Sequence, residues 1–107
     1  MNEPEIPSND DGATACGQPI SRVLDIINSR GLHARASARF VQTVEKFDAD
    51  VKVTRGGETV GGTSIMGLMM LSAGQGTSIT VTTDGTQAQE VMDALVALVG
   101  DRFGEED

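Results

Sequence analysis

The sequence contains neither tryptophan nor tyrosine, and its only aromatic residues are three phenylalanines. Binding of single-stranded nucleic acid relies on aromatic rings that stack on the bases. The formal net charge of −8 at pH 7 also opposes contact with a phosphate backbone or an anionic lipid surface. A nucleic-acid partner and a membrane partner are therefore both disfavoured, and the core must be built from aliphatic residues and methionine.

Cysteine and histidine each occur once, as Cys16 and His33. A single cysteine cannot form an intramolecular disulfide, which suits a reducing compartment. No second histidine and no paired cysteine is available to complete a metal site, so we expect no metal and no cofactor. No nucleophile-elbow motif surrounds a serine, which disfavours a serine hydrolase.

Long apolar runs are also missing, because none approaches the roughly 20 residues that span a bilayer. The first twenty residues have neither the basic nor the apolar segment of a secretory signal, so we expect a cytoplasmic protein. Residues 1–20 are rich in Pro, Gly, Asn, Asp and Ser, and their acids are balanced by no Lys or Arg. We interpret them as a disordered N-terminal extension, followed by one domain over 21–103 and an acidic tail over 104–107.

Hydrophobic periodicity predicts an alternation of strands and helices along the domain. Two glycines in "RGGE" favour a hairpin turn between the second and third strands. Thr86 and Gln89 fit a capping box at the start of the last helix. The predicted strands cover residues 21–27, 48–54, 59–62 and 77–83, and the predicted helices cover residues 34–47, 64–71 and 86–103.

This order, β-α-β-β-α-β-α, predicts an α+β fold. Three helices, of which one is short, cannot cover both faces of a four-stranded sheet. We therefore expect an open-faced β-sandwich, in which a four-stranded antiparallel sheet carries all three helices on one face.

The single histidine lies in "GLHARASARF", at or just before the start of the first predicted helix. The first N–H groups of a helix lack intrahelical partners and favour an anion. Arg30, Arg35 and Arg39 are the only charged residues between positions 29 and 44, which makes this a basic island in an acidic protein. An imidazole placed here could accept a phosphoryl group, although a histidine near a helix terminus is more often an ordinary solvated residue.

The second informative segment is "GGTSIMGLMML". Thr63 or Ser64 can cap a short helix, on which Ile65, Met66 and Met69 share one face. We expect Leu68 and Leu71 to belong to the core. For the other three apolar residues, a core role and a role as a flexible docking surface remain open.

Together, "GLHARASARFVQTVEKF" and "GGTSIMGLMML" resemble the HPr family, the histidine phosphocarrier proteins of the bacterial phosphoenolpyruvate-dependent phosphotransferase system. The resemblance covers about residues 21–103. It implies a monomeric, stoichiometric phosphoryl carrier rather than an enzyme. Such a carrier accepts the phosphoryl group from enzyme I and passes it to a downstream EIIA-type acceptor.

The resemblance also assigns roles to individual residues. It implies that His33 is phosphorylated on Nδ1 and that Arg35 steadies the phosphoryl group. Ser64 matches the position phosphorylated in regulation where an HPr serine kinase/phosphorylase exists. The partner-docking positions implied by the resemblance are Ile65, Met66 and Met69.

The chain departs from the family pattern at Ala36, where proline is usual. The sequence leaves open whether the carrier serves sugar transport or a nitrogen-type regulatory branch. It also leaves open a rival function, in which the protein is a non-catalytic regulator that docks through the surface around Ser64 and Met66.

Overall fold

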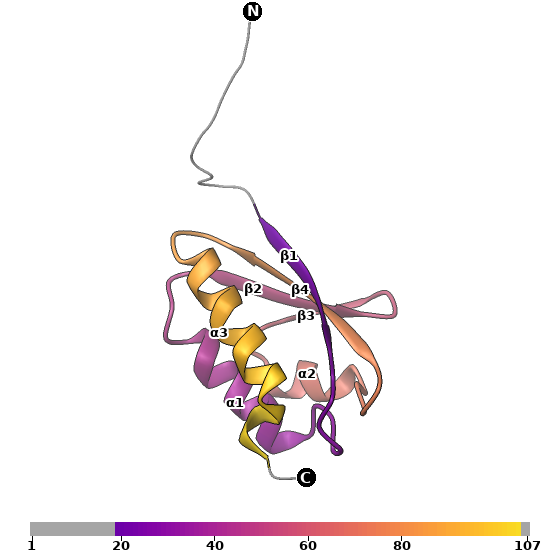
Figure 1. Cartoon of the computed structure of the whole chain (residues 1–107). Coiled ribbons are helices and arrows are strands. Elements are labelled where there is room, and N and C mark those ends of the chain that lie inside the picture. Colours follow the sequence, from indigo (N-terminus) through magenta and orange to yellow (C-terminus); the bar gives the residue numbers. More distant parts are fainter. Residues whose placement is uncertain (1–18, 106–107) are drawn as a thin grey trace, which may run out of the picture.

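The computed structural model describes residues 19–105 and has the predicted element order (Figure 1). The predicted hairpin is confirmed, with left-handed glycines at its turn. The strands are β1 (Ile20–Asp25), β2 (Asp50–Arg55), β3 (Glu58–Gly61) and β4 (Ser78–Asp84), and the helices are α1 (Ala34–Val44), α2 (Ile65–Met70), α3 (Ala88–Gly100) and the 3-10 turn η2 (Arg102–Gly104).

The four strands form one antiparallel sheet in the order β1-β4-β2-β3. Burial alternates along β2 and β4, as expected for strands with one covered face. Directly opposed residues share the covered face, such as Leu24 with Ile79 and Val53 with Val81. The register therefore places an aliphatic layer on one side of the sheet only.

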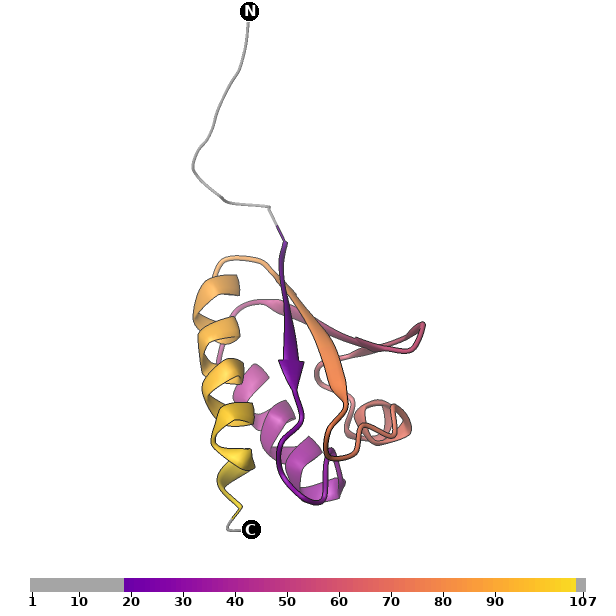
Figure 2. The ribbon, with the colours of Figure 1, turned by 45° about the vertical axis from the view of Figure 1, so that its right-hand side comes forward.

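All three α-helices contribute to the layer that covers this face (Figure 2). α1 and α3 lie side by side, and α2 packs against α1 and β3. The largest fully buried side chains include two phenylalanines, Phe40 from α1 and Phe103 from η2. The predicted α+β open-faced sandwich is confirmed.

Three details of the predicted helices are wrong, the first being that the last helix ends at Gly100 and not at residue 103. α1 ends at Val44, so Phe47 lies in the following turn, where it still packs against the core. The capping box at Thr86 and Gln89 does not form, because the residue preceding α3 is Gln87 and its side chain makes no cap hydrogen bond. The Gln87 side chain instead accepts a hydrogen bond from the backbone N–H of Asp48 at 2.7 Å.

The described secondary structure extends one residue beyond residues 21–103 at each end. β1 begins at Ile20, one residue before the predicted domain boundary. At the other end, Gly104 belongs to η2, and the Glu105 side chain bonds the body of the domain. Residues 1–18 of the predicted extension, and the last two residues of the predicted tail, lie outside the described residues. Within residues 19–105, no helix is long and apolar enough to cross a membrane.

Candidate functional site

The loop that leads into α1 contains a glycine, Gly31, that another residue could replace only with backbone strain and a steric clash. Gly31 has a φ of +64°, and a Cβ there would lie 2.3 Å from the carbonyl oxygen of Ala73. Only glycine combines this left-handed conformation with so close an approach to another backbone segment. The next residue, Leu32, donates its N–H to the same carbonyl at 2.9 Å. This contact fixes the position from which the next residue, His33, projects.

His33 is the N-cap residue of α1, as the sequence predicted. Its Nδ1 accepts a hydrogen bond from the backbone N–H of Arg35 at 3.2 Å. The imidazole therefore occupies the place that an N-cap Ser or Asp side chain usually takes. A quarter of the side chain is exposed to solvent. The first N–H groups of a helix have no intrahelical partners, and that of Arg35 is directed at Nδ1.

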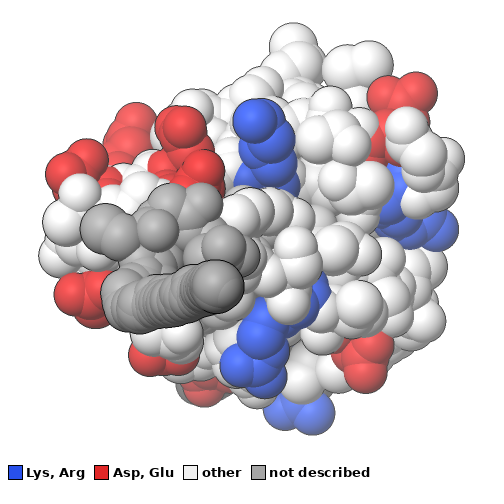
Figure 3. All heavy atoms as spheres, turned by 90° about the horizontal axis from the view of Figure 1, so that it is seen from above, with Lys and Arg blue, Asp and Glu red and all other residues white. Residues whose placement is uncertain are grey.

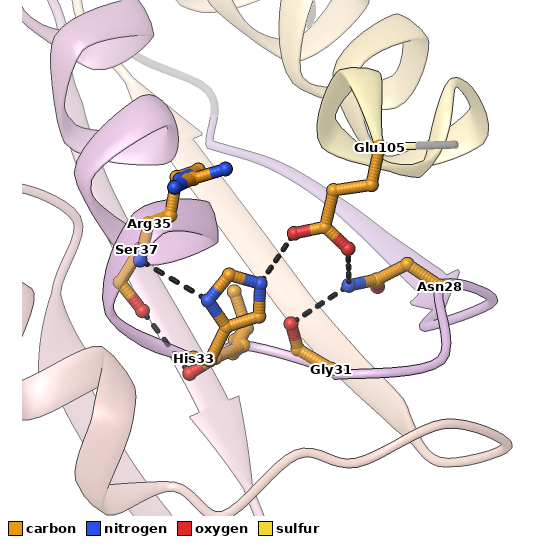
Figure 4. A network of polar contacts seen from close by, with 7 residues as sticks. Asn28, Gly31, His33, Arg35, Ser37 and Glu105 are labelled. Carbon is orange, nitrogen blue, oxygen red and sulfur yellow. Dashed lines mark hydrogen bonds and ion pairs between the residues drawn. The ribbon is translucent and has the colours of Figure 1, made fainter. Parts of the chain in front are cut away.

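The other ring nitrogen faces the C-terminal segment. His33 Nε2 bonds Oε2 of Glu105, a residue 72 positions away in the chain (Figure 4). The second carboxylate oxygen, Oε1, accepts a hydrogen bond from Nδ2 of Asn28 at 3.0 Å. Asn28 is fully buried, and its Nδ2 also donates to the carbonyl oxygen of Gly31 at 2.9 Å. The ring is thus held between the start of α1 and the end of the domain.

These contacts indicate which of the two ring nitrogens carries the proton when the imidazole is neutral. An ionised carboxylate can only accept hydrogen bonds, so the ring proton resides on Nε2. Nδ1 faces a backbone N–H and must present its lone pair. A neutral imidazole with the lone pair on Nδ1 is a nucleophile, and this lone pair points to the helix N-terminus, where an anion is favoured.

The three arginines of the basic island are all exposed. Figure 4 shows the Arg35 side chain running along α1, away from the imidazole. One turn later, the guanidinium of Arg39 lies against Gly104, where a Cβ would come within 2.6 Å of Nη1. Arg39 therefore lies beside the C-terminal segment, and the Arg35 guanidinium makes no contact with the ring in this conformation.

The second predicted region is the start of α2. Ser64 is its N-cap, and the hydroxyl accepts the N–H of Gly67 at 3.0 Å. Met66 is 70% exposed, and Ile65 and Met69 are each 41% exposed, whereas Leu68 and Leu71 are buried. The assignment of the two leucines to the core is confirmed, and the three other side chains form an apolar surface.

Three residues of these regions were missed by the sequence analysis. Asn28 lies between the first predicted strand and the first predicted helix, and Glu105 lies in the predicted acidic tail. Neither has a local signal, because Glu105 meets Asn28 and His33 only through the tertiary fold. Met70, 75% exposed, extends the apolar surface of α2. Its position four residues after Met66 could have indicated this.

One hollow among the described residues lies away from His33. A cavity of about 350 Å³ lies at the opposite end, where β4 finishes and α3 begins, and it is lined by Asp48, Asp50 and Asp84 among others. Figure 3 looks onto this end and shows acidic side chains gathered along one side. No cluster of metal-ligating side chains is found in the part of the chain that the structure describes. His33 lies outside this hollow, at the other end of the domain, and is partly exposed.

Comparison with known proteins agrees with this geometry. The PTS-HPr family, described as the PTS HPr component phosphorylation site, matches residues 20–101. The phosphocarrier protein HPr of Cupriavidus necator is 52% identical over 86 residues, covering 80% of this chain and 97% of the relative. HPr of Neisseria meningitidis is 49% identical over the same shares of the two chains.

A solved structure shows the same fold. The crystal structure of HPr-C-His from Thermoanaerobacter tengcongensis superposes with a TM-score of 0.78 at 39% identity, covering 82% of this chain and 99% of that one. The chain belongs to the HPr family of phosphocarrier proteins of the phosphotransferase system.

Proposed function

We propose that His33 is the phosphoryl acceptor, which takes the group from phospho-enzyme I and passes it to a downstream EIIA-type protein. The observation that carries the proposal is the orientation of the ring: Nδ1 faces the N-terminus of α1, and the side chain is partly exposed. A carrier needs a nucleophile that two different proteins can reach in turn. An exposed N-cap imidazole meets that requirement.

The chemistry is an exchange between two imidazoles. A bond forms between Nδ1 of His33 and phosphorus, the bond to the donor's histidine breaks, and its electron pair returns to the donor ring. Such a transfer depends on positioning and charge neutralisation more than on covalent machinery. The N–H of Arg35, which bonds Nδ1 before transfer, would then be directed at a phosphoryl oxygen.

Arg35 is the residue we propose to steady the phosphoryl group. Its guanidinium is exposed and lies along the helix that His33 caps, so a rotamer change brings it toward the group. Arginine suits this role because its planar fork can donate two hydrogen bonds to phosphate oxygens. A single mobile arginine also leaves the group free to move on to the acceptor.

The apolar surface of Ile65, Met66 and Met69 is the proposed docking site for both partners. Methionine is flexible and polarisable, which suits a surface that meets more than one protein. Ser64 lies at the edge of this surface as the cap of α2. We propose it as a regulatory phosphorylation site for a serine kinase, because a phosphate there would add about −1.5 to −2 charge beside the apolar contact.

The test is phosphorylation with phosphoenolpyruvate and purified enzyme I. We expect one phosphoryl group per chain, stable in base and labile in acid, and no label on His33→Ala. Label retained by His33→Ala would overturn the assignment. Arg35→Ala should be labelled more slowly, whereas exposed Arg30→Ala on the preceding loop is the matched control for loss of a positive charge.

A purely regulatory docking protein is the alternative, favoured by the exposure of Met66. It predicts that partner proteins bind His33→Ala as well as the wild type and that no phosphoryl group is passed on. Transfer to EIIA proteins of a sugar branch and of a nitrogen-type branch, compared side by side, would identify the pathway. A monomer in the cytoplasm is the form in which we expect the carrier to act.

A further inference from the structure

The ring of His33 is bonded at both nitrogens, and the proposed transfer uses only one of them. From the contacts at Nε2 we infer that Glu105 is a positioning residue for phosphoryl transfer: its carboxylate fixes the reactive tautomer of His33 and balances the charge that the ring acquires. This inference rests on the proposed function of His33. It gives a role to the acidic C-terminal segment, which the sequence analysis described only as an acidic tail.

The position of Glu105 is itself well determined by the fold. Arg102, Phe103 and Gly104 all have left-handed φ values, between 55° and 77°. Such a run is unfavourable for residues other than glycine. It is maintained because the Phe103 side chain, fully buried, anchors the segment in the core. Glu105 follows two residues after Phe103, and its carboxylate bonds His33.

The carboxylate is also held by a second partner. Asn28 donates one N–H of its amide to Glu105 and the other to the carbonyl oxygen of Gly31. Because both acceptors require a donor, the amide has only one consistent orientation. The Glu105 side chain is only 14% exposed, so its bond to the ring is protected from competing water. The arrangement resembles the way in which a buried carboxylate orients a catalytic histidine in hydrolases.

The first consequence concerns the tautomer. A neutral imidazole in water carries its proton on either nitrogen, and a proton on Nδ1 would remove the lone pair that attacks phosphorus. Glu105 accepts only from Nε2–H, so it keeps the proton away from Nδ1. Every neutral His33 ring is then in the form that can react.

The second consequence concerns charge. When Nδ1 gives its electron pair to phosphorus, the proton stays on Nε2 and the ring becomes positive. The Glu105 carboxylate supplies the counter-charge at the far nitrogen. On onward transfer the pair returns to Nδ1 and the ring is neutral again. No proton enters or leaves in either direction, which suits a reversible carrier.

Replacement of the carboxylate by an amide tests both consequences. In Glu105→Gln the side chain can donate to the ring as well as accept from it, so the wrong tautomer becomes accessible. We expect ¹⁵N NMR of the neutral imidazole to show the Nε2–H form in the wild type and a mixture in the variant. We expect transfer from phospho-enzyme I to slow by roughly tenfold to a hundredfold, the range for loss of one charge-assisted hydrogen bond.

The matched control is Asp101→Asn, which makes the same change in charge on the same segment. The Asp101 side chain makes no cap hydrogen bond, so we expect wild-type tautomer and rate. Glu105→Asp keeps the charge on a shorter side chain and should recover part of the rate. Wild-type tautomer together with wild-type rate in Glu105→Gln would overturn the inference, as would equal slowing in the control.

The inference and the proposed function fail in different ways. If wild-type protein takes no phosphoryl group on His33, the proposed function is wrong, and the NMR comparison still decides whether Glu105 sets the tautomer. If the wild type is phosphorylated and Glu105→Gln is unchanged in both measurements, only the positioning role is wrong. A folded state of each variant is checked by its amide NMR spectrum.

Discussion

The starts of α1 and α2 are both capped by a side chain, and they are built in opposite ways. At α2 the Ser64 hydroxyl bonds the N–H of Gly67, three residues along the same chain segment. At α1 the His33 ring bonds Arg35 on one side and Glu105 on the other, 72 residues away. The first cap is local, and the second depends on the fold of the whole domain.

The difference matches the role that we propose for each site. A group that transfers phosphate must be held in one orientation, and only distant, buried partners can impose it. A docking surface and its regulatory hydroxyl need exposure and some freedom, which a local cap provides. Variants that change one of these helix starts can be compared with the other, unchanged start as the reference.

Removal of the anchor of the C-terminal segment should have the largest effect. Phe103→Ala empties a fully buried aromatic site, which should lower the free energy of unfolding by about 3–5 kcal/mol. It should also release Glu105, so that hydrogen exchange rises around His33 and remains low in α2. Denaturant titration and amide exchange measure the two effects.

Phe47→Ala is the control for this change. Phe47 is only partly buried and lies far from the C-terminal segment along the chain, in the turn after α1. We expect a smaller loss of stability and unchanged exchange around His33. Equal exchange at both helix starts in Phe103→Ala would show that the cap of α1 does not depend on the distant segment.

A negative charge at Ser64 should slow phosphoryl transfer from enzyme I and leave the fold intact. Ser64→Asp keeps a good N-cap residue and places a negative charge at a helix N-terminus, which tolerates it. Beside Met66 and Ile65, the charge should oppose docking and slow phosphorylation by enzyme I by about tenfold, equivalent to about 1.4 kcal/mol. Gln42→Glu adds the same charge on exposed α1 and should leave the rate unchanged.

Single-turnover kinetics with phospho-enzyme I measure this effect. A wild-type rate in Ser64→Asp would remove the regulatory proposal for Ser64, since it would show that charge beside the apolar surface is harmless. A similar loss in Gln42→Glu would attribute the slowing to net charge rather than to position.

The contrast between local and distant contacts also explains what the sequence could predict. The element order, the open-faced sheet and both helix caps were accessible, because periodicity and cap chemistry act over a few residues. The capping box at α3 was wrong because Gln87, and not Thr86, is the residue that precedes the helix. Asn28 and Glu105 could not be found, since nothing near either residue indicates that the fold joins them to His33.

Loss of the local cap should have a smaller effect than loss of the distant anchor. Ser64→Ala removes the hydroxyl that accepts the N–H of Gly67, and this should cost about 1 kcal/mol of unfolding free energy. Thr63→Ala, at the neighbouring exposed position that the sequence also offered as a cap, should cost much less. Equal losses would mean that the α2 cap is shared, and thermal or denaturant unfolding of both variants decides it.

The smallest change in stability should come from the docking surface. Met66 is 70% exposed, so Met66→Ala should alter the free energy of unfolding by less than about 0.5 kcal/mol. Because it removes contact area at the proposed docking surface, it should still slow phosphorylation by enzyme I, by up to about fivefold. Val23→Ala, 66% exposed on β1, is the matched control and should change neither quantity. If the two variants behave alike in both measurements, the exposed methionines are ordinary surface residues, and partners must recognise the α1 side of the molecule alone.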